Sequence, residues 1–384
     1  MKKLLCALLV LVTTMSFIFT GCSGNNDNVI KIGINYELSG EVASYGQASV
    51  DGIKLAVEEI NKAGGINGKL IELVEYDNKS DKAEATTLAT KLMTRNKVVA
   101  VLGPATSGAF KATIPVANEN KIPVISGSAT ADDVTVDANG VKEYAFRICF
   151  NDSYQGIAMG QYALNNLSKT KAVIIMDSSS DYAKGLAKNF NEAFKAGGGS
   201  IAAEEAYVAG DTDFNAIITK IKGLDFDVIF IPGYYQEAGL IIKQAREQGI
   251  DVPILGADGF DSPVLLELAG ASNLNDIYFS NHYSSLDKDP SVQSFISAFK
   301  AEFNKEPNAF NALGYDLAKF VIAGIANAEG EVTGESVKTA LADTKDFVGV
   351  TGSFSIDENH NPVKAIVVIQ LTDGVQSSSE RVSQ

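Results

Sequence analysis

Short apolar runs alternate with segments of helical periodicity along most of this chain. The clearest case is the stretch Val98–Thr130, where the apolar runs Val98–Leu102 and Ile122–Ser126 flank a predicted helix over Phe110–Asn118. Each run ends in a loop of small polar residues, GPATSG after the first and GSAT after the second. Strand, loop, helix and strand in this order predict a doubly wound parallel sheet, whose ligands lie beyond the carboxyl ends of the strands.

The same order of elements occurs twice. The first set adds strands Val29–Asn35, Lys69–Asp77 and Tyr144–Ile148 and helices Ala48–Asn61 and Asp81–Thr94 to the stretch above. The second set is predicted as helices Ser153–Leu167, Leu186–Lys195, Phe214–Ile221 and Ala238–Gln248 with strands Ala172–Met176, Ile201–Tyr207, Asp227–Ile231, Val252–Leu255 and Ile277–Phe279. We therefore expect two copies of one α/β design.

The last part of the chain departs from this pattern. Helices Ser291–Asn304, Asn308–Ala328 and Glu335–Ala342 come without a matching set of strands, before strands Gly352–Ile356 and Ala365–Leu371 and a polar tail that we expect to be frayed. We expect the extra helices to return to the first copy. This predicts two doubly wound domains joined by a multi-strand hinge, residues 29–149 with 283–356 and residues 150–282 with 357–384.

The N-terminus has the features of a targeting segment. Lys2 and Lys3 precede an apolar stretch that is too short for a membrane span, so residues 1–21 are predicted to be a signal peptide. The pair Gly21–Cys22 resembles a bacterial lipobox, although Phe19 stands where Leu is preferred, and the alternative is a secreted protein with an incidental cysteine. Residues 22–28 would then be a lipid-anchored tether.

Charge and cysteine content narrow the choice of partners. The chain of 384 residues carries a net charge of −15, and losing Lys2 and Lys3 takes the mature chain to about −17. Such acidity argues against nucleic acids and anionic lipid surfaces. Cys6 is expected to be removed with the signal peptide and Cys22 to carry the lipid, which leaves Cys149 as the remaining cysteine. We therefore expect no intramolecular disulfide in the mature chain, whose stability would depend on large apolar cores.

The two sets of loops differ in chemistry. The first set carries hydroxyls and backbone N–H groups, which suit a carboxylate, with Ser107, Ser128 and Thr130 side by side. The second set carries carboxylates and phenols: Asp181, Tyr182, Tyr234, Tyr235, Asp258 and Asp261. If both sets face one cleft, a small zwitterion fits, with its carboxylate on the first side and its ammonium on the second.

With these segments in view, the chain resembles the substrate-binding proteins of branched-chain amino-acid ABC transporters, which have the type I periplasmic-binding clamshell fold. The resemblance covers essentially all of the mature chain. It rests on IKIGINYELSGEVASYGQASVDGIKLAVEEINKAGGINGKLIELVEYD, VLGPATS, IPVISGSAT, FRICFNDSYQG and GYYQE followed by GADG.

The resemblance implies roles for individual residues. The ligand carboxylate would be bound by Ser107, Thr130 and backbone groups of Ser128 and Ala129. The ligand ammonium would be bound by Tyr182, Tyr234 and Asp258. The ligand side chain would contact Tyr45 and Phe310. Asp258 is one methylene shorter than the Glu that the family often has, so the identity of the amino acid stays open. Asp152 matches a position near the hinge.

Structural roles compete with these assignments. Ser107 and Thr130 would also serve as helix N-caps, and Asp258 as a turn residue. Tyr182 and Tyr235 would alternatively lie only at the rim of the interface, which is the expected place for Tyr235. Arg147 is expected in a structural role, and Asp181 and Asp261 are expected to be solvated.

We expect a binding protein rather than an enzyme. The chain has only two histidines, His282 and His360, neither near metal-type ligands in sequence, and GxSxG, Walker and GxGxxG motifs are absent. The resemblance implies a monomer without cofactor or metal, anchored to the outer face of a bacterial cell membrane, which delivers an amino acid to an ABC permease. The alternative is an amino-acid or amide receptor that feeds a signalling protein.

Overall fold

The structure is a computed structural model that describes residues 28–382. Its first sheet is fully parallel, in the order β2-β1-β3-β4-β7. The strands are β1 (Val29–Tyr36), β2 (Leu70–Asp77), β3 (Ala100–Leu102), β4 (Val124–Ser126) and β7 (Ala145–Arg147). All side chains of β3, β4 and β7 are buried, as expected for a sheet with helices on both faces.

The second sheet repeats this order and then extends it. Its parallel part runs β9-β8-β10-β11-β12, followed by the antiparallel strands β15 and β16. The strands are β8 (Lys171–Asp177), β9 (Ser200–Tyr207), β10 (Val228–Phe230), β11 (Ile254–Gly256), β12 (Ile277–Asn281), β15 (Ile366–Thr372) and β16 (Val375–Val382). Both sheets therefore follow one doubly wound order, which confirms the predicted duplication.

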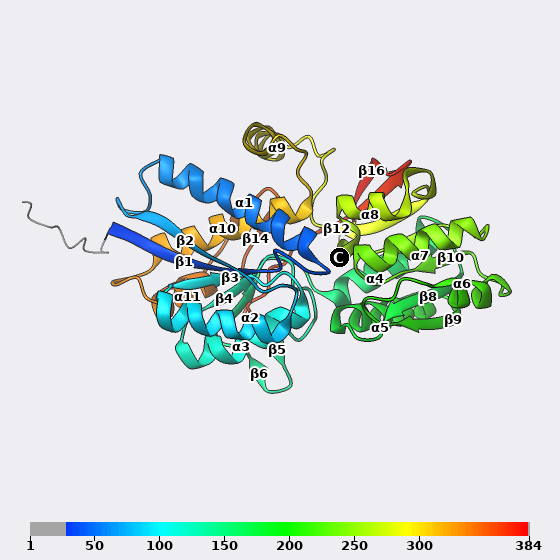
Figure 1. Cartoon of the computed structure of the whole chain (residues 1–384), viewed down its shortest axis with the longest axis horizontal. Helices are drawn as coiled ribbons and strands as arrows, with labels where there is room; N and C mark the ends of the chain where they lie inside the picture. The colour runs from blue at the N-terminus through cyan, green and yellow to red at the C-terminus, as the bar shows by residue number, and fades with distance from the viewer. Residues whose placement is uncertain (1–27, 383–384) are drawn as a thin grey trace, which may run out of the picture.

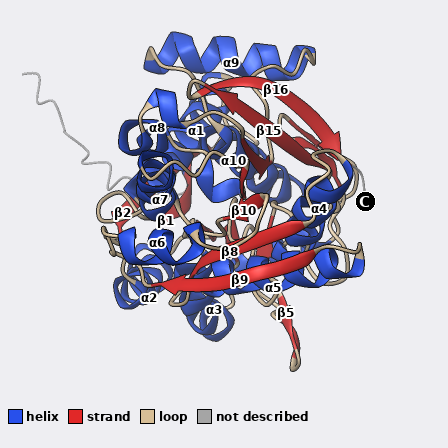
Figure 2. Cartoon of the chain, turned by 90° about the vertical axis from the view of Figure 1, so that its right-hand side faces the viewer, coloured by secondary structure: helices blue, strands red, loops and turns tan. Residues whose placement is uncertain are grey.

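Strand β16 corrects the prediction of a frayed polar tail. It pairs with β15 along its length and forms the edge of the second sheet (Figure 2). Its polar side chains are mostly exposed, because one face of an edge strand remains in solvent while the backbone hydrogen bonds hold it in place. Polarity alone therefore did not distinguish an exposed edge strand from a loop.

Each sheet has its own set of helices, on the left and right of Figure 1. The first sheet is covered by α1 (Ala43–Lys62), α2 (Lys82–Lys91), which continues as a π-helical turn at Leu92–Asn96, α3 (Ser107–Asn120), α10 (Ala309–Asn327) and α11 (Gly334–Ala342). The second has α4 (Asp152–Asn165), α5 (Asp181–Ala196), α6 (Asn215–Lys222), α7 (Tyr235–Glu247) and α8 (Pro263–Ala269). Helix α9 (Pro290–Phe303) precedes α10, and the hairpins are β5–β6 (Val136–Asp137, Gly140–Val141) and β13–β14 (Phe347–Gly349, Gly352–Phe354).

Helix α10 returns to the first sheet and packs along α1, as expected for the extra helices. Two glycines permit this contact: a Cβ on Gly52 would lie 1.9 Å from the Asn311 carbonyl oxygen, and one on Gly314 would lie 2.0 Å from that of Ser49. Although α10 is long and apolar enough to cross a membrane, 83% of its 18-residue apolar window is buried, so it is a core helix; no other helix of the described part passes that test.

The chain passes between the two sheets three times, after β7, after β12 and between β14 and β15. This connectivity agrees with a hinge of several strands, while the residue limits of the two domains stay a prediction. The predicted signal peptide, Cys22 and most of the tether lie outside the described residues.

Candidate functional site

A cavity lies between the carboxyl ends of the two sheets. We call its two sides the first wall, with residues from the first sheet and its helices, and the second wall, with residues from the second. The cavity is about 10 Å³ in volume, room for about one water molecule. Its lining contains seven predicted site residues, Tyr45, Ser107, Ser128, Tyr182, Tyr234, Asp258 and Phe310, together with Ala105, Thr106 and Gly259.

Ser107 on the first wall has a hydroxyl hydrogen available for a ligand. It is the first residue of α3, and its Oγ accepts a hydrogen bond from the Ala131 N–H at 3.0 Å. The N-cap of α3 is Thr106, so the alternative role of Ser107 as an N-cap is wrong. Since Oγ acts as an acceptor in this bond, its own hydrogen remains free to donate.

Ser128 and Ala129 are bonded within their own loop. The Ser128 hydroxyl donates to the Ala105 carbonyl at 3.0 Å. The backbone N–H groups of Ser128 and Ala129 donate to Ser126 Oγ, at 3.3 and 3.0 Å. A ligand carboxylate would have to draw these two N–H groups away from Ser126, so their predicted contribution stays a prediction.

Two predicted site residues, Ala129 and Thr130, do not line the cavity but follow the lining residue Ser128 in the same loop, and Thr130 has the least engaged hydroxyl of this loop. Its side chain is fully buried, and Oγ1 has no hydrogen-bond partner among the described residues. Its carbonyl accepts hydrogen bonds from the Asp152 N–H at 2.8 Å and from Arg147 Nη1 at 2.9 Å. The Arg147 side chain thus holds the backbone of this loop, which agrees with its expected structural role. Thr130 is not the N-cap of the following helix, because Asn151 caps α4.

Sequence reasoning missed Glu37 below the first wall. Its buried carboxylate accepts hydrogen bonds from the Ala105 and Thr106 N–H groups, at 2.9 and 3.1 Å, and from Thr106 Oγ1 at 2.9 Å. Burial raises the pKa of the Glu37 carboxyl, and these donors act in the opposite direction. Glu37 thereby fixes the loop that precedes Ser107; the only signal in the sequence was an acidic residue in a ligand-side loop.

Tyr182 on the second wall joins several groups. Its hydroxyl donates to Asp258 Oδ1 at 2.7 Å and accepts from the Gly259 N–H at 3.0 Å. Its ring stacks on Tyr234, with centroids 5.2 Å apart. The predicted loop is in fact the first turn of α5, because Ser180 caps the helix one residue before Asp181.

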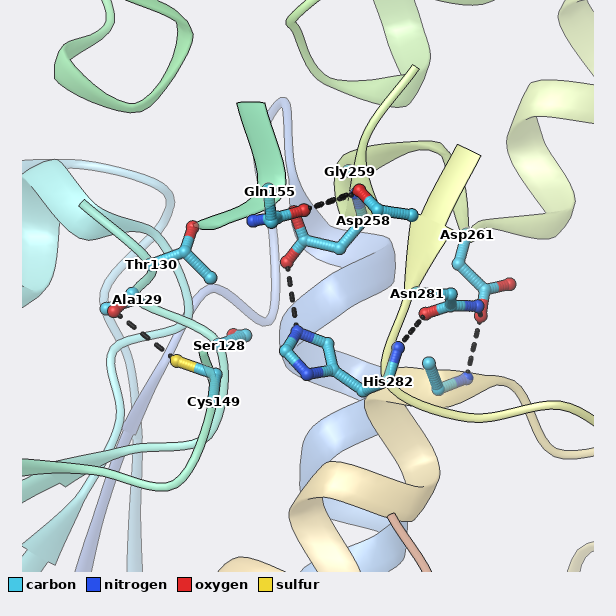
Figure 3. Close-up of polar contacts among 12 residues, drawn as sticks. Ser128, Ala129, Thr130, Cys149, Gln155, Asp258, Gly259, Asp261, Asn281 and His282 are labelled. Carbon is cyan, nitrogen blue, oxygen red and sulfur yellow. Dashed lines mark hydrogen bonds and ion pairs between the residues drawn. The ribbon is translucent and has the colours of Figure 1, made fainter. Parts of the chain in front are cut away.

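Asp258 is a buried carboxylate in the short 3-10 helix Asp258–Phe260, and only 3% of the residue is exposed. One of its oxygens accepts a hydrogen bond from the Tyr182 hydroxyl, and the other lies 3.4 Å from His282 Nε2. Figure 3 shows the contact with His282. Burial lowers the pKa of His282, so at neutral pH neither partner carries a full positive charge. A buried carboxylate in such surroundings is costly until a cation joins it.

The aromatic residues connect the two walls. Tyr45 stacks on Phe310 with centroids 4.3 Å apart, and its hydroxyl donates to the Gly259 carbonyl at 2.5 Å. The Tyr235 hydroxyl donates to the Glu41 carbonyl at 2.9 Å, and its residue begins α7 instead of lying in a loop. Tyr235 thus holds the walls together beside the cavity, which agrees with its predicted place at the rim.

The two remaining carboxylates of the second wall differ. Asp181 is exposed, as expected, and pairs with Lys111 at 2.7 Å and Lys184 at 3.1 Å. The expectation of a solvated Asp261 is wrong, because its carboxylate accepts hydrogen bonds from Asn281 Nδ2 and the Ala309 N–H, both at 2.8 Å. Within residues 28–382, no group of three or more His, Cys, Asp or Glu side chains is arranged to hold a metal ion.

Comparison with known proteins shows the family to which this fold and cavity belong. The family model described as "Periplasmic binding protein" matches residues 29–376. The chain belongs to this family. A leucine-, isoleucine-, valine-, threonine- and alanine-binding protein of Pseudomonas aeruginosa is 30% identical over 332 residues, 86% of each chain.

Two solved structures extend the comparison. The branched-chain amino-acid transporter substrate-binding protein LivJ of Streptococcus pneumoniae, in complex with isoleucine, is 45% identical, with a TM-score of 0.88 over 93% of this chain and 100% of LivJ. An ABC-transporter solute-binding protein of R. palustris in complex with benzoate is 26% identical, with a TM-score of 0.82 over 93% and 98%. This chain is accordingly an extracytoplasmic solute-binding protein with the type I periplasmic-binding fold.

Proposed function

We propose that this protein binds a branched-chain α-amino acid between its two walls and delivers it to an ABC permease. The names of the relatives support this ligand class: the P. aeruginosa protein is named for binding leucine, isoleucine, valine, threonine and alanine, and LivJ was solved with isoleucine. The geometry of the cavity supports it independently.

The observation that carries the proposal is the buried Asp258 carboxylate. An α-ammonium group between Asp258, Tyr182 and Tyr234 would supply the missing positive charge and face the aromatic rings. Benzoate, the ligand of the R. palustris relative, has a carboxylate but no ammonium. Asp258 therefore favours an amino acid over an aromatic acid.

The first wall would receive the carboxylate of the same ligand. The free hydroxyl hydrogen of Ser107 and the unpartnered Oγ1 of Thr130 are the available donors. The stacked rings of Tyr45 and Phe310 offer an apolar surface for an aliphatic side chain. All α-amino acids share the first two interactions, so discrimination among them falls to the third.

Ligand entry requires the walls to separate, because the cavity of about 10 Å³ is far smaller than an amino acid. The contacts that would open include the Tyr45–Gly259 hydrogen bond and the Ser44 Oγ–Ser262 Oγ contact at 2.8 Å. A ligand that bonds to both walls then favours the closed state, since it makes both sets of contacts only there.

The remaining elements of the proposal concern the whole protein. Acylation of Cys22 would hold the protein at the outer face of the cell membrane, where a monomer would present its ligand to the permease. We propose no catalytic role, since both Asp258 oxygens are engaged and a carboxylate that pairs with an ammonium is poorly placed to accept a proton.

A thermal-shift screen of the twenty amino acids and benzoate tests the proposal. Ligand at a hundredfold excess over its Kd stabilises a folded protein by about 2.7 kcal/mol. We expect the largest increases in melting temperature with isoleucine, leucine and valine, confirmed by calorimetry, and recovery of the ligand chemically unchanged. A response to benzoate alone, or to none of these compounds, would contradict the proposal.

A further inference from the structure

His282 stands directly behind the carboxylate that we assign to the ligand ammonium. It follows β12, its side chain is 1% exposed, and its Nε2 lies 3.4 Å from Asp258 Oδ2 (Figure 3). The other carboxylate oxygen accepts from Tyr182 at 2.7 Å. The two oxygens of Asp258 are thus oriented by side chains from two different segments.

The surroundings of the imidazole indicate its tautomer. His282 Nδ1 is buried and has no hydrogen-bond partner among the described residues. A hydrogen on Nδ1 would be a buried donor without an acceptor, which is costly, whereas a hydrogen on Nε2 points at a carboxylate. The neutral ring therefore carries its hydrogen on Nε2 and donates toward Asp258.

His282 also lies where the chain passes between the two sheets. Its ring stacks on Phe150, which follows β7 in the first connection, with centroids 3.6 Å apart and planes 17° apart. Its backbone N–H donates to Asn281 Oδ1 at 2.9 Å, and Asn281 Nδ2 donates to Asp261 at 2.8 Å. The imidazole thus belongs to the second interdomain connection and contacts both the first connection and the turn that carries Asp258.

We propose that His282 is a positioning residue that links Asp258 to the connections between the sheets, and that its protonated form competes with the ligand ammonium for the Asp258 carboxylate. This inference rests on the proposed function, because it takes Asp258 as the ammonium partner. It makes amino-acid binding weaker in acid.

The charges around the ring determine the sign of this effect. Asp258 favours the imidazolium, whereas burial and the buried Lys364 of the third connection oppose it, so the pKa of His282 falls below its ordinary 6.5. Cys149 and Asp152 lie close to the same cluster, and Asp152 Oδ2 has no partner among the described residues. Because a proton on His282 neutralises Asp258, ligand binding expels it, and affinity falls only once the pH drops below the lowered pKa of His282, by at most tenfold per pH unit.

Two variants separate positioning from packing. His282→Phe keeps a ring against Phe150 but removes the donor, while His282→Gln keeps an N–H donor near Nε2 but does not titrate. We expect isoleucine binding at pH 7.5, measured by calorimetry, to weaken about tenfold in His282→Phe and less than threefold in His282→Gln. Between pH 7.5 and 5, the wild type should lose affinity and His282→Gln should not.

The second histidine provides a matched control. His360 also stacks on a phenylalanine, Phe146, with centroids 4.0 Å apart, but its Nδ1 lies 3.0 Å from the Ala145 carbonyl, and its hydrogen bonds do not include Asp258. His360→Phe should keep the acid-dependent loss of affinity. The inference is overturned if His282→Gln keeps the wild-type pH slope, if the slope disappears only in Asp152→Asn, or if His282→Phe binds like the wild type.

A ligand-free measurement distinguishes this inference from the proposed function. The chain has two histidines, so the His282 ring signals can be followed by NMR while pH is varied. Asp258→Asn should lower the pKa of His282, because it removes the charge that favours the imidazolium. An unchanged pKa contradicts the pair. If Asp258→Asn lowers the pKa of His282 but the wild type binds no branched-chain amino acid, the pair is supported and the proposed function is contradicted.

Discussion

The two walls of the cavity hold polar groups in opposite ways. The hydroxyls of the first wall bond to backbone groups of the same wall: the Ser128 hydroxyl donates to the Ala105 carbonyl, and Ser107 Oγ accepts from the Ala131 N–H. The second wall is built from side chains that meet from distant segments, since Asp258 is bonded by Tyr182 and faced by His282. The groups that the first wall presents to the cavity are neutral, although the buried Glu37 carboxylate fixes their loop from behind, whereas the second wall presents an ionisable carboxylate.

Under the proposed function, the first wall recognises the ligand carboxylate and the second wall recognises the ligand ammonium. Neutral donors that are already held by their loops lose little freedom when they bind an anion. A buried carboxylate on the other wall rejects a ligand without a positive charge, because it would stay uncompensated. Substitutions on the two walls should therefore differ in size and in their effect on the ligand-free protein.

The largest effect is expected on the second wall. Asp258→Ala should weaken isoleucine binding by about a hundredfold or more, because the ligand ammonium would be buried without a counter-ion. Calorimetry measures the change. Asp225→Ala, an exposed carboxylate paired with Lys171, is the control and should bind like the wild type. An unchanged affinity in Asp258→Ala would remove Asp258 from the site.

A smaller effect is expected on the first wall. Thr130→Val removes a hydroxyl that has no partner in the described structure, so it should weaken isoleucine binding about tenfold without lowering the melting temperature of the ligand-free protein. Ser128→Ala should show the reverse, with a lower melting temperature and nearly unchanged affinity, since its hydroxyl already bonds to Ala105. If Thr130→Val destabilised the free protein instead, its hydroxyl would have a structural role.

The smallest effect is expected where the walls meet in solvent. Lys111 of α3 pairs with Asp181 of α5 across the cleft at 2.7 Å, and exposed ion pairs contribute little. Lys111→Ala should weaken isoleucine binding two- to threefold at low salt and less at high salt. Lys184→Ala, which breaks a pair within α5, should leave affinity unchanged. Equal effects in both variants would show that the pair does not stabilise the closed state.

Local pattern predicted most of the architecture. The alternation of apolar runs and helices predicted both doubly wound sheets, because buried parallel strands are nearly continuous in hydrophobicity and their loops are polar. Of the nine residues that the resemblance assigned to the ligand, seven line one cavity, while Ala129 and Thr130 do not. Helix starts were less well predicted: α3 and α5 begin earlier than expected, because residues of the polar loops occupy their first turns.

The amino-acid sequence by itself determined the repeated order of elements and the contrast between a hydroxyl loop set and an acidic, aromatic one, since both follow from residue type and spacing. Only the tertiary structure decided which polar groups are already bonded. It placed Glu37 under the Ser107 loop, bonded the half-buried Asp261 to Asn281, and brought His282 to Asp258. These contacts join residues far apart in the chain or on separate elements, and their partners depend on how sheets and helices pack, which periodicity does not encode.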